Sequence, residues 1–88
     1  MISILACDRA SANNLLFSTE KDSQVKVTIY SILGEKVNVI QNSELKAGTY
    51  NISWLGKDAQ GNKVPSGVYF YEVVSDNRTA KGKMLLLK

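Results

Sequence analysis

Apolar and polar residues alternate with a period of two along most of this 88-residue chain. The segment "QVKVTIY" places Val25, Val27 and Ile29 on one face, and the same spacing recurs in "TYNISW", residues 49–54. This alternation predicts strands with one buried face. No segment of useful length shows the 3.6-residue period of an amphipathic helix. We therefore expect an all-β protein.

Turn-forming residues divide the chain into six or seven short strands. "LGEK" (33–36) and "SDNR" (75–78) are typical of tight hairpin connections, and Gly56–Gly67 is the longest connection. Pro65 is expected at a strand entry or an edge, because proline donates no hydrogen bond to a sheet. The segment "GVYFYEVVS" is apolar on both faces except at Glu72, which is typical of a central strand. The pattern predicts a two-sheet sandwich, with these residues in its core: Trp54, Ile29, Val27 and Tyr69.

The length and composition fit one globular domain. Hydrophobic residues make up 44% of the chain and charged residues 22%, unlike a disordered segment. We expect the domain to span residues 15–88, preceded by a linker or an added leader over residues 1–14. No apolar run reaches the roughly 18–20 residues of a membrane helix, so no membrane insertion is expected. The single cysteine, Cys7, excludes an internal disulfide.

Few side chains in the sequence can carry chemistry. Histidine is absent, which removes the commonest general base and the commonest neutral metal ligand. The motif "DAQGN" (58–62) lacks the spaced oxygen ligands and distant glutamate of a calcium loop, so an Asx-type turn is expected. We expect no enzyme activity, no metal and no cofactor.

The net charge of +3 comes from 11 Lys and Arg against 8 Asp and Glu. The basic residues are scattered rather than gathered in a stripe, so a nucleic-acid partner is not expected. Aromatic residues at strand spacing belong more often to a core than to a sugar-binding stack. If a stack is exposed, we expect it at Tyr69 and Tyr71, or at Tyr30.

The apolar end of the chain, "KMLLLK" (83–88), is unusual because chain ends are mostly polar. One interpretation is a last strand that pairs with "GVYFYEVVS", with Met84 and Leu86 facing one way and Leu85 and Leu87 the other. Burying one leucine stabilises a fold by about 1.5–3 kcal/mol. A second interpretation is that the end serves as a recognition signal.

Longer motifs carry a resemblance. The order "VKVTIYSILGEKV", "LKAGTYNISWLGKDAQGNKVPSGVYFYEV" and "KGKMLLLK" resembles the C-terminal sorting domains of the bacterial type IX secretion system. It is also similar to the Ig-like module of flagellar hook-capping proteins. The match covers about Leu15 to Lys88 and implies an Ig-like β-sandwich of six to seven antiparallel strands.

The resemblance implies a non-catalytic sorting or anchoring module, which directs an extracellular protein through type IX secretion to the bacterial cell surface. Its partners would be the secretion machinery at the outer membrane and a cargo domain upstream in the same polypeptide. The protein would be secreted or held at the cell surface. The residues implied for recognition are Gly67, Tyr69, Lys83, Met84, Leu85, Leu86, Leu87 and Lys88.

Two alternatives remain open at this point. The chain is instead a structural Ig-like spacer or assembly module of a secreted hydrolase or a flagellar hook cap, or it is a carbohydrate-binding module. An exposed pair of coplanar aromatic rings would favour the carbohydrate-binding module.

Overall fold

A computed structural model of the chain describes residues 2–8, 13–76 and 78–86. These residues form seven strands and no helix: β1 (Ile2–Asp8), β2 (Asn13–Thr19), β3 (Ser23–Tyr30), β4 (Lys36–Leu45), β5 (Gly48–Trp54), β6 (Gly67–Ser75) and β7 (Arg78–Leu86). Every strand pair is antiparallel. The predicted all-β sandwich is confirmed.

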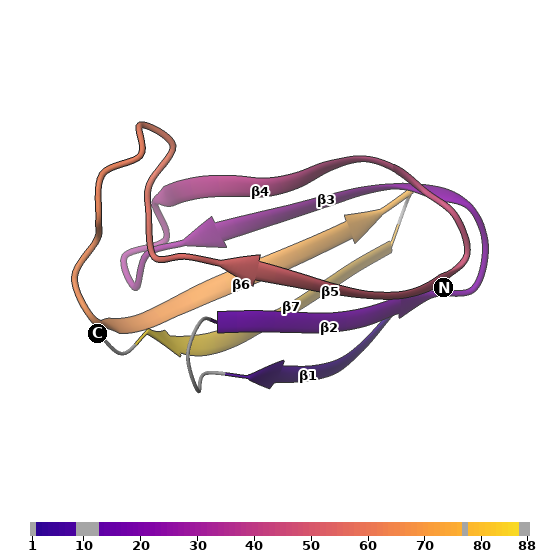
Figure 1. Cartoon of the computed structure of the whole chain (residues 1–88), viewed down its shortest axis with the longest axis horizontal. Coiled ribbons are helices and arrows are strands. Elements are labelled where there is room, and N and C mark those ends of the chain that lie inside the picture. Colours follow the sequence, from indigo (N-terminus) through magenta and orange to yellow (C-terminus); the bar gives the residue numbers. More distant parts are fainter. Residues whose placement is uncertain (1, 9–12, 77, 87–88) are drawn as a thin grey trace.

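The strands form two sheets that face each other (Figure 1). One has the order β1-β2-β5 and the other has the order β4-β3-β6-β7. The chain therefore crosses between the sheets after β2, after β4 and after β5. β6 lies between β3 and β7, which confirms the central strand that its two apolar faces predicted.

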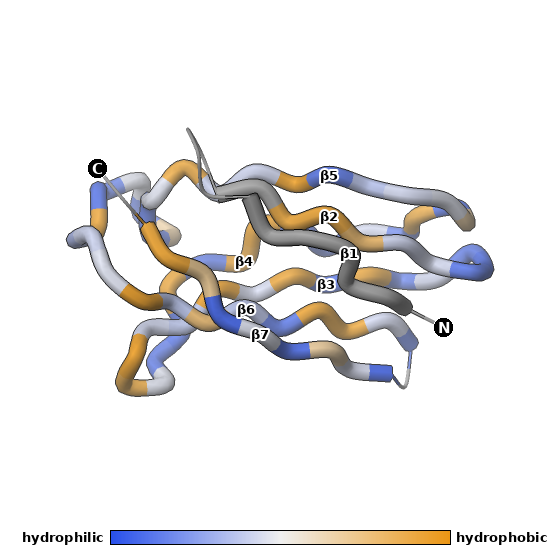
Figure 2. Tube along the Cα trace, turned by 90° about the horizontal axis from the view of Figure 1, so that it is seen from below, coloured by the Kyte–Doolittle hydropathy of each residue, from blue (hydrophilic) through white to orange (hydrophobic). Residues whose placement is uncertain are grey.

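The core lies between the sheets and is built from the inward residues of both. The alternation of apolar and polar residues is visible along β3 in Figure 2. Trp54 meets the ring of Tyr69 edge-on, with ring centroids 4.9 Å apart. All four predicted core residues are buried, and the full set is Leu15, Phe17, Val25, Val27, Ile29, Trp54, Tyr69, Tyr71, Val73, Met84 and Leu86.

The first part of the chain differs from the expectation of a linker over residues 1–14. Ile2–Asp8 form β1, which pairs with β2, and β2 begins at Asn13 rather than at Leu15. The segment "ISILACD" has a weak strand signal of its own, and the polar run after it separates it from the rest. Pairing with β2 supplies the backbone hydrogen bonds that turn it into a strand.

The predicted connections are confirmed. Between β3 and β4 the Ser31 N–H donates to the Glu35 carbonyl (2.8 Å) and the Gly34 N–H to the Ser31 carbonyl (2.9 Å). Gly34 has a φ of +85°, which favours glycine. In the long connection, the Asp58 carboxylate accepts from the N–H groups of Gln60 (3.0 Å) and Asn62 (2.9 Å), which makes the predicted Asx-type turn. Pro65 lies just before β6.

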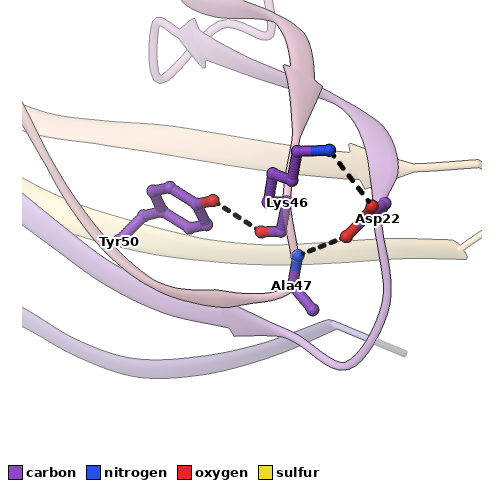
Figure 3. Close-up of polar contacts among 4 residues, drawn as sticks. All are labelled: Asp22, Lys46, Ala47 and Tyr50. Carbon is purple, nitrogen blue, oxygen red and sulfur yellow. Dashed lines mark hydrogen bonds and ion pairs between the residues drawn. The ribbon is translucent and has the colours of Figure 1, made fainter.

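Two turns at one end of the sandwich are tied together by Asp22 (Figure 3). Its carboxylate accepts from the Ala47 N–H (2.8 Å) and lies 3.7 Å from the Lys46 ammonium. The Tyr50 hydroxyl donates to the Lys46 carbonyl at 2.5 Å. These contacts hold the β4–β5 connection against the β2–β3 connection.

Asp22→Ala is expected to lower the free energy of unfolding by about 1 kcal/mol, because an intramolecular hydrogen bond contributes about that much. The exposed ion pair with Lys46 adds little. Urea unfolding measures the change, and Asp22→Asn, which keeps the acceptor oxygen, is the matched control. Equal losses in the two variants would mean that the charge, and not the hydrogen bond, holds the turns together.

Candidate functional site

The residues singled out by the sequence meet along one strand pair. β6 and β7 place Gly67 opposite Leu86, Tyr69 opposite Met84, and Phe70 opposite Lys83. The structure thus brings together two motifs that are separated in the sequence, "SGVY" and the apolar chain end. Leu87 and Lys88 lie outside the described residues.

Gly67 and Tyr69 have structural roles at the start of β6. Gly67 has a φ of +153°, a backbone conformation that residues other than glycine rarely adopt. The buried Tyr69 donates its hydroxyl hydrogen to the carbonyl of Pro65 at 2.6 Å. A tyrosine that bonds to the backbone a few residues upstream recurs at the same corner of Ig-type sandwiches. Their role in recognition stays a prediction.

The free energy of unfolding is expected to fall as the pH rises above about 10, the ordinary pKa of tyrosine. Burial raises the pKa of Tyr69 above 10.0 in the folded chain. Between the pKa of the unfolded chain and that of the folded chain, the unfolded chain binds fewer protons, so the free energy of unfolding falls as the pH rises. Below the pKa of the unfolded chain, the contribution of Tyr69 to stability is fully present.

Urea unfolding between about pH 9 and pH 11 measures this decline. In Tyr69→Phe, which keeps the ring but has no ionisable hydroxyl, the decline should be shallower. An equally steep decline in that variant would assign the effect to other groups.

β7 presents different residues on its two faces. Met84 and Leu86 are buried against the core, whereas Lys83 is exposed and Leu85 is half-buried on the opposite face. For the described part of the chain end, this confirms the predicted alternation. β7 pairs only with β6 and forms one edge of its sheet. The apolar end is therefore a structural strand whose outer face and edge remain available to a partner.

The outer face of the four-stranded sheet carries a groove of about 610 Å³. Its floor includes Tyr30 and Phe70, which pair across β3 and β6. Glu72, Lys81 and Lys83 line it on the side of β7, and Gly34 of the β3–β4 turn also lines it.

The groove contains one polar network. The Tyr30 hydroxyl donates to one oxygen of Glu72 at 3.3 Å, and the other oxygen lies 3.6 Å from the Lys81 ammonium. Partial burial, followed by the negative charge of Glu72, raises the pKa of Tyr30. The Glu72 carboxylate therefore accepts one hydrogen bond and lies beside one ammonium group. Lys83 forms no ion pair with another described residue.

The aromatic residues are mostly core, as expected. Tyr69 and Tyr71 are buried, and of the positions named for an exposed stack only Tyr30 is half-buried, opposite Phe70, which is 38% exposed. Sequence reasoning missed Phe70, Glu72 and Lys81 as groove residues. Only the register between β3, β6 and β7 places them together, and the sequence of one strand carries no signal for it.

The described ranges contain no group of three or more His, Cys, Asp or Glu side chains placed to hold a metal ion. The same ranges contain no helix of the length and apolar character needed to cross a membrane.

Comparisons with known proteins agree with this architecture. The structure of FlgD from P. aeruginosa matches with a TM-score of 0.69 and 28% sequence identity over 97% of this chain. This chain spans 65% of the length of that FlgD chain. No curated protein matches the sequence. The family model of the FlgD Ig-like domain matches residues 9–79, so the chain belongs to the FlgD Ig-like domain family.

Proposed function

We propose that this chain is a non-catalytic, structural Ig-like module of a flagellar hook cap or a related extracellular assembly. The proposal is carried by its membership of the FlgD Ig-like domain family, with a match over residues 9–79. The 28% identity to FlgD of P. aeruginosa supports it. Because the chain spans only 65% of that protein, a role in capping belongs to the proposal.

The shape of the module suits a spacer. Its principal extents are 35 × 23 × 19 Å. β1 begins near one end of the long axis and β7 ends near the other (Figure 1). A segment joined before β1 and one joined after β7 would be held at opposite ends of a rigid sandwich. The polar contacts of the described side chains are hydrogen bonds and ion pairs of strands and turns, as in a structural module.

The test is deletion of residues 2–88, which include all seven strands, from the polypeptide in its native host. Hook length, measured by electron microscopy, is expected to change or hooks to be lost, and the unaltered chain should restore them. Hooks of normal length and number after deletion would overturn the hook-cap role. Immunoblots must show that the rest of the polypeptide is still made.

A second candidate is the type IX sorting and anchoring module, acting at the cell surface with the secretion machinery and an upstream cargo domain. It is favoured by β7, an edge strand near the end of the chain with Lys83 exposed. A free strand edge suits strand addition by a receptor. This role predicts recognition of exposed charge and backbone at the chain end.

The sorting role is tested by fusing the chain to a neutral reporter in a type IX-competent host. Lys83→Glu together with Lys88→Glu should block surface delivery, whereas Lys21→Glu, in the β2–β3 connection, should not. Delivery equal to that of the unaltered fusion would exclude charge recognition, and no delivery of the unaltered fusion would exclude sorting. Deletion of residues 83–88 is a poorer test, because it also removes the buried Met84 and Leu86.

A further inference from the structure

The groove on the outer face of the four-stranded sheet has an apolar floor that the fold leaves uncovered. Phe70 is 38% exposed and Val68, two residues earlier on the same face, is 36% exposed. Val68 lies opposite the half-buried Leu85 of β7. Neither Phe70 nor Val68 is among the buried residues of the sandwich core. A floor of this kind can take up an apolar side chain from another molecule.

The apolar surface continues toward the β3–β4 turn. A smaller hollow of about 280 Å³ is lined by Val68 and by Ile32 of that turn. Ile32 is 67% exposed and its neighbour Leu33 is 82% exposed. The main groove and the smaller hollow both reach the β3–β4 turn, through Gly34 and Ile32. Together we name them the β6 groove and define it by Tyr30, Ile32, Val68, Phe70 and Lys83. Contiguous exposed apolar surface with a polar border is characteristic of interaction sites.

The charge of the β6 groove indicates the chemistry of its occupant. Glu72 is engaged by Tyr30 and Lys81, at 3.3 and 3.6 Å. Lys83 lies directly opposite Phe70 and has no ion-pair partner among the described residues. An apolar floor therefore has an unmatched ammonium group beside it.

The rest of this face is balanced, with Lys26 and Lys36 against Glu35 and Glu44. Because Lys81 lies beside Glu72, the one positive charge left over on these positions is that of Lys83. Complementary charge favours an acidic partner and steers its approach. An acidic apolar segment matches both the apolar floor and the unpaired Lys83 ammonium group, whereas a neutral sugar would leave that charge unmatched.

We infer that the β6 groove docks an extended segment of a partner protein in which an aromatic or branched aliphatic side chain stands next to a carboxylate. The apolar side chain covers Phe70 and Tyr30, and the carboxylate pairs with Lys83. This inference goes beyond the structural role proposed above. Its test uses the isolated chain in solution and does not depend on the formation of hooks.

The experiment is selection of a phage-displayed random peptide library on the full chain. Recovered peptides are expected to pair an aromatic or aliphatic residue with Asp or Glu. In NMR titrations they should shift the amide signals of β6 and β7 around Phe70 and Lys83. Phe70→Ser and Lys83→Glu should each weaken binding by about tenfold or more. Added salt should weaken it too, because exposed charges are screened.

Lys21→Glu is the matched control, because it makes the same charge change just before β3 begins, at the end of the strand away from Tyr30. Amide spectra establish that each variant is folded, and Lys83→Gln keeps the test valid if Phe70→Ser is not folded. The inference is overturned if no peptide is enriched, if the peptides lack acidic residues, or if Lys21→Glu weakens binding as much as Lys83→Glu. If peptides shift the amide signals along β7 but bind Phe70→Ser as tightly as the unaltered chain, binding occurs by strand addition, and the inference is also overturned.

Discussion

Trp54→Ala is expected to lower the free energy of unfolding by about 3–5 kcal/mol, the usual cost of removing a large aromatic side chain from a core. Trp54 is 1% exposed and packs edge-on against Tyr69. Its indole N–H donates to the Lys57 carbonyl at 2.9 Å, which fixes the start of the long connection. Since small domains are stable by only about 5–15 kcal/mol, the variant should unfold at a much lower urea concentration.

Two variants bracket this result. Leu55→Ala removes a side chain that is 69% exposed next to Trp54, so its effect should stay within about 0.5 kcal/mol. Trp54→Phe keeps part of the ring volume but loses the N–H donor, and should fall between the two. A Trp54→Ala transition close to that of the unaltered chain would contradict the assignment of Trp54 to the core.

Gly82→Val is expected to destabilise the fold by about 1–3 kcal/mol through overpacking. Gly82 lies opposite Tyr71 in the β6–β7 pair, and a Cβ at this position would overlap the Tyr71 ring. Valine normally favours strands and glycine weakens them. Strand propensity alone would make Gly82→Val stabilising, so a loss of stability would be due to the clash with the Tyr71 ring.

The control for Gly82→Val is the same substitution in a Tyr71→Ala background. Once the ring is gone, valine at position 82 should be neutral or stabilising, so the sign of its effect should reverse. Urea unfolding of the two single variants and the double variant gives the interaction energy. Additive effects would show that the Tyr71 ring moves aside freely.

The pattern of single strands was readable from the sequence because the side-chain period of a strand is two. Val27, Ile29 and Trp54 are buried as their alternation predicted. The two apolar faces of "GVYFYEVVS" indicated a central strand, and β6 is central. Each of these predictions depends only on neighbours within one segment.

The residues of the β6 groove could not be predicted from single strands. Phe70 belongs to a segment whose apolar residues all look alike in the sequence, yet Tyr69 and Tyr71 are buried while Phe70 faces outward. That Lys83 stands beside Phe70, and that Glu72 meets Tyr30 and Lys81, follows from the register of three strands. Register is set by the packing of the whole sheet.

By itself, the sequence determined that this chain forms a β-sandwich with Val27, Ile29, Trp54 and Tyr69 in its core, because alternation and turn residues act over a few neighbouring positions. Only the tertiary structure decided that Ile2–Asp8 form a strand and that Gly82 must leave room for Tyr71. It also decided which face of β6 remains open to a partner. These features depend on contacts between segments that the chain brings together only when the two sheets assemble, so no local pattern encodes them.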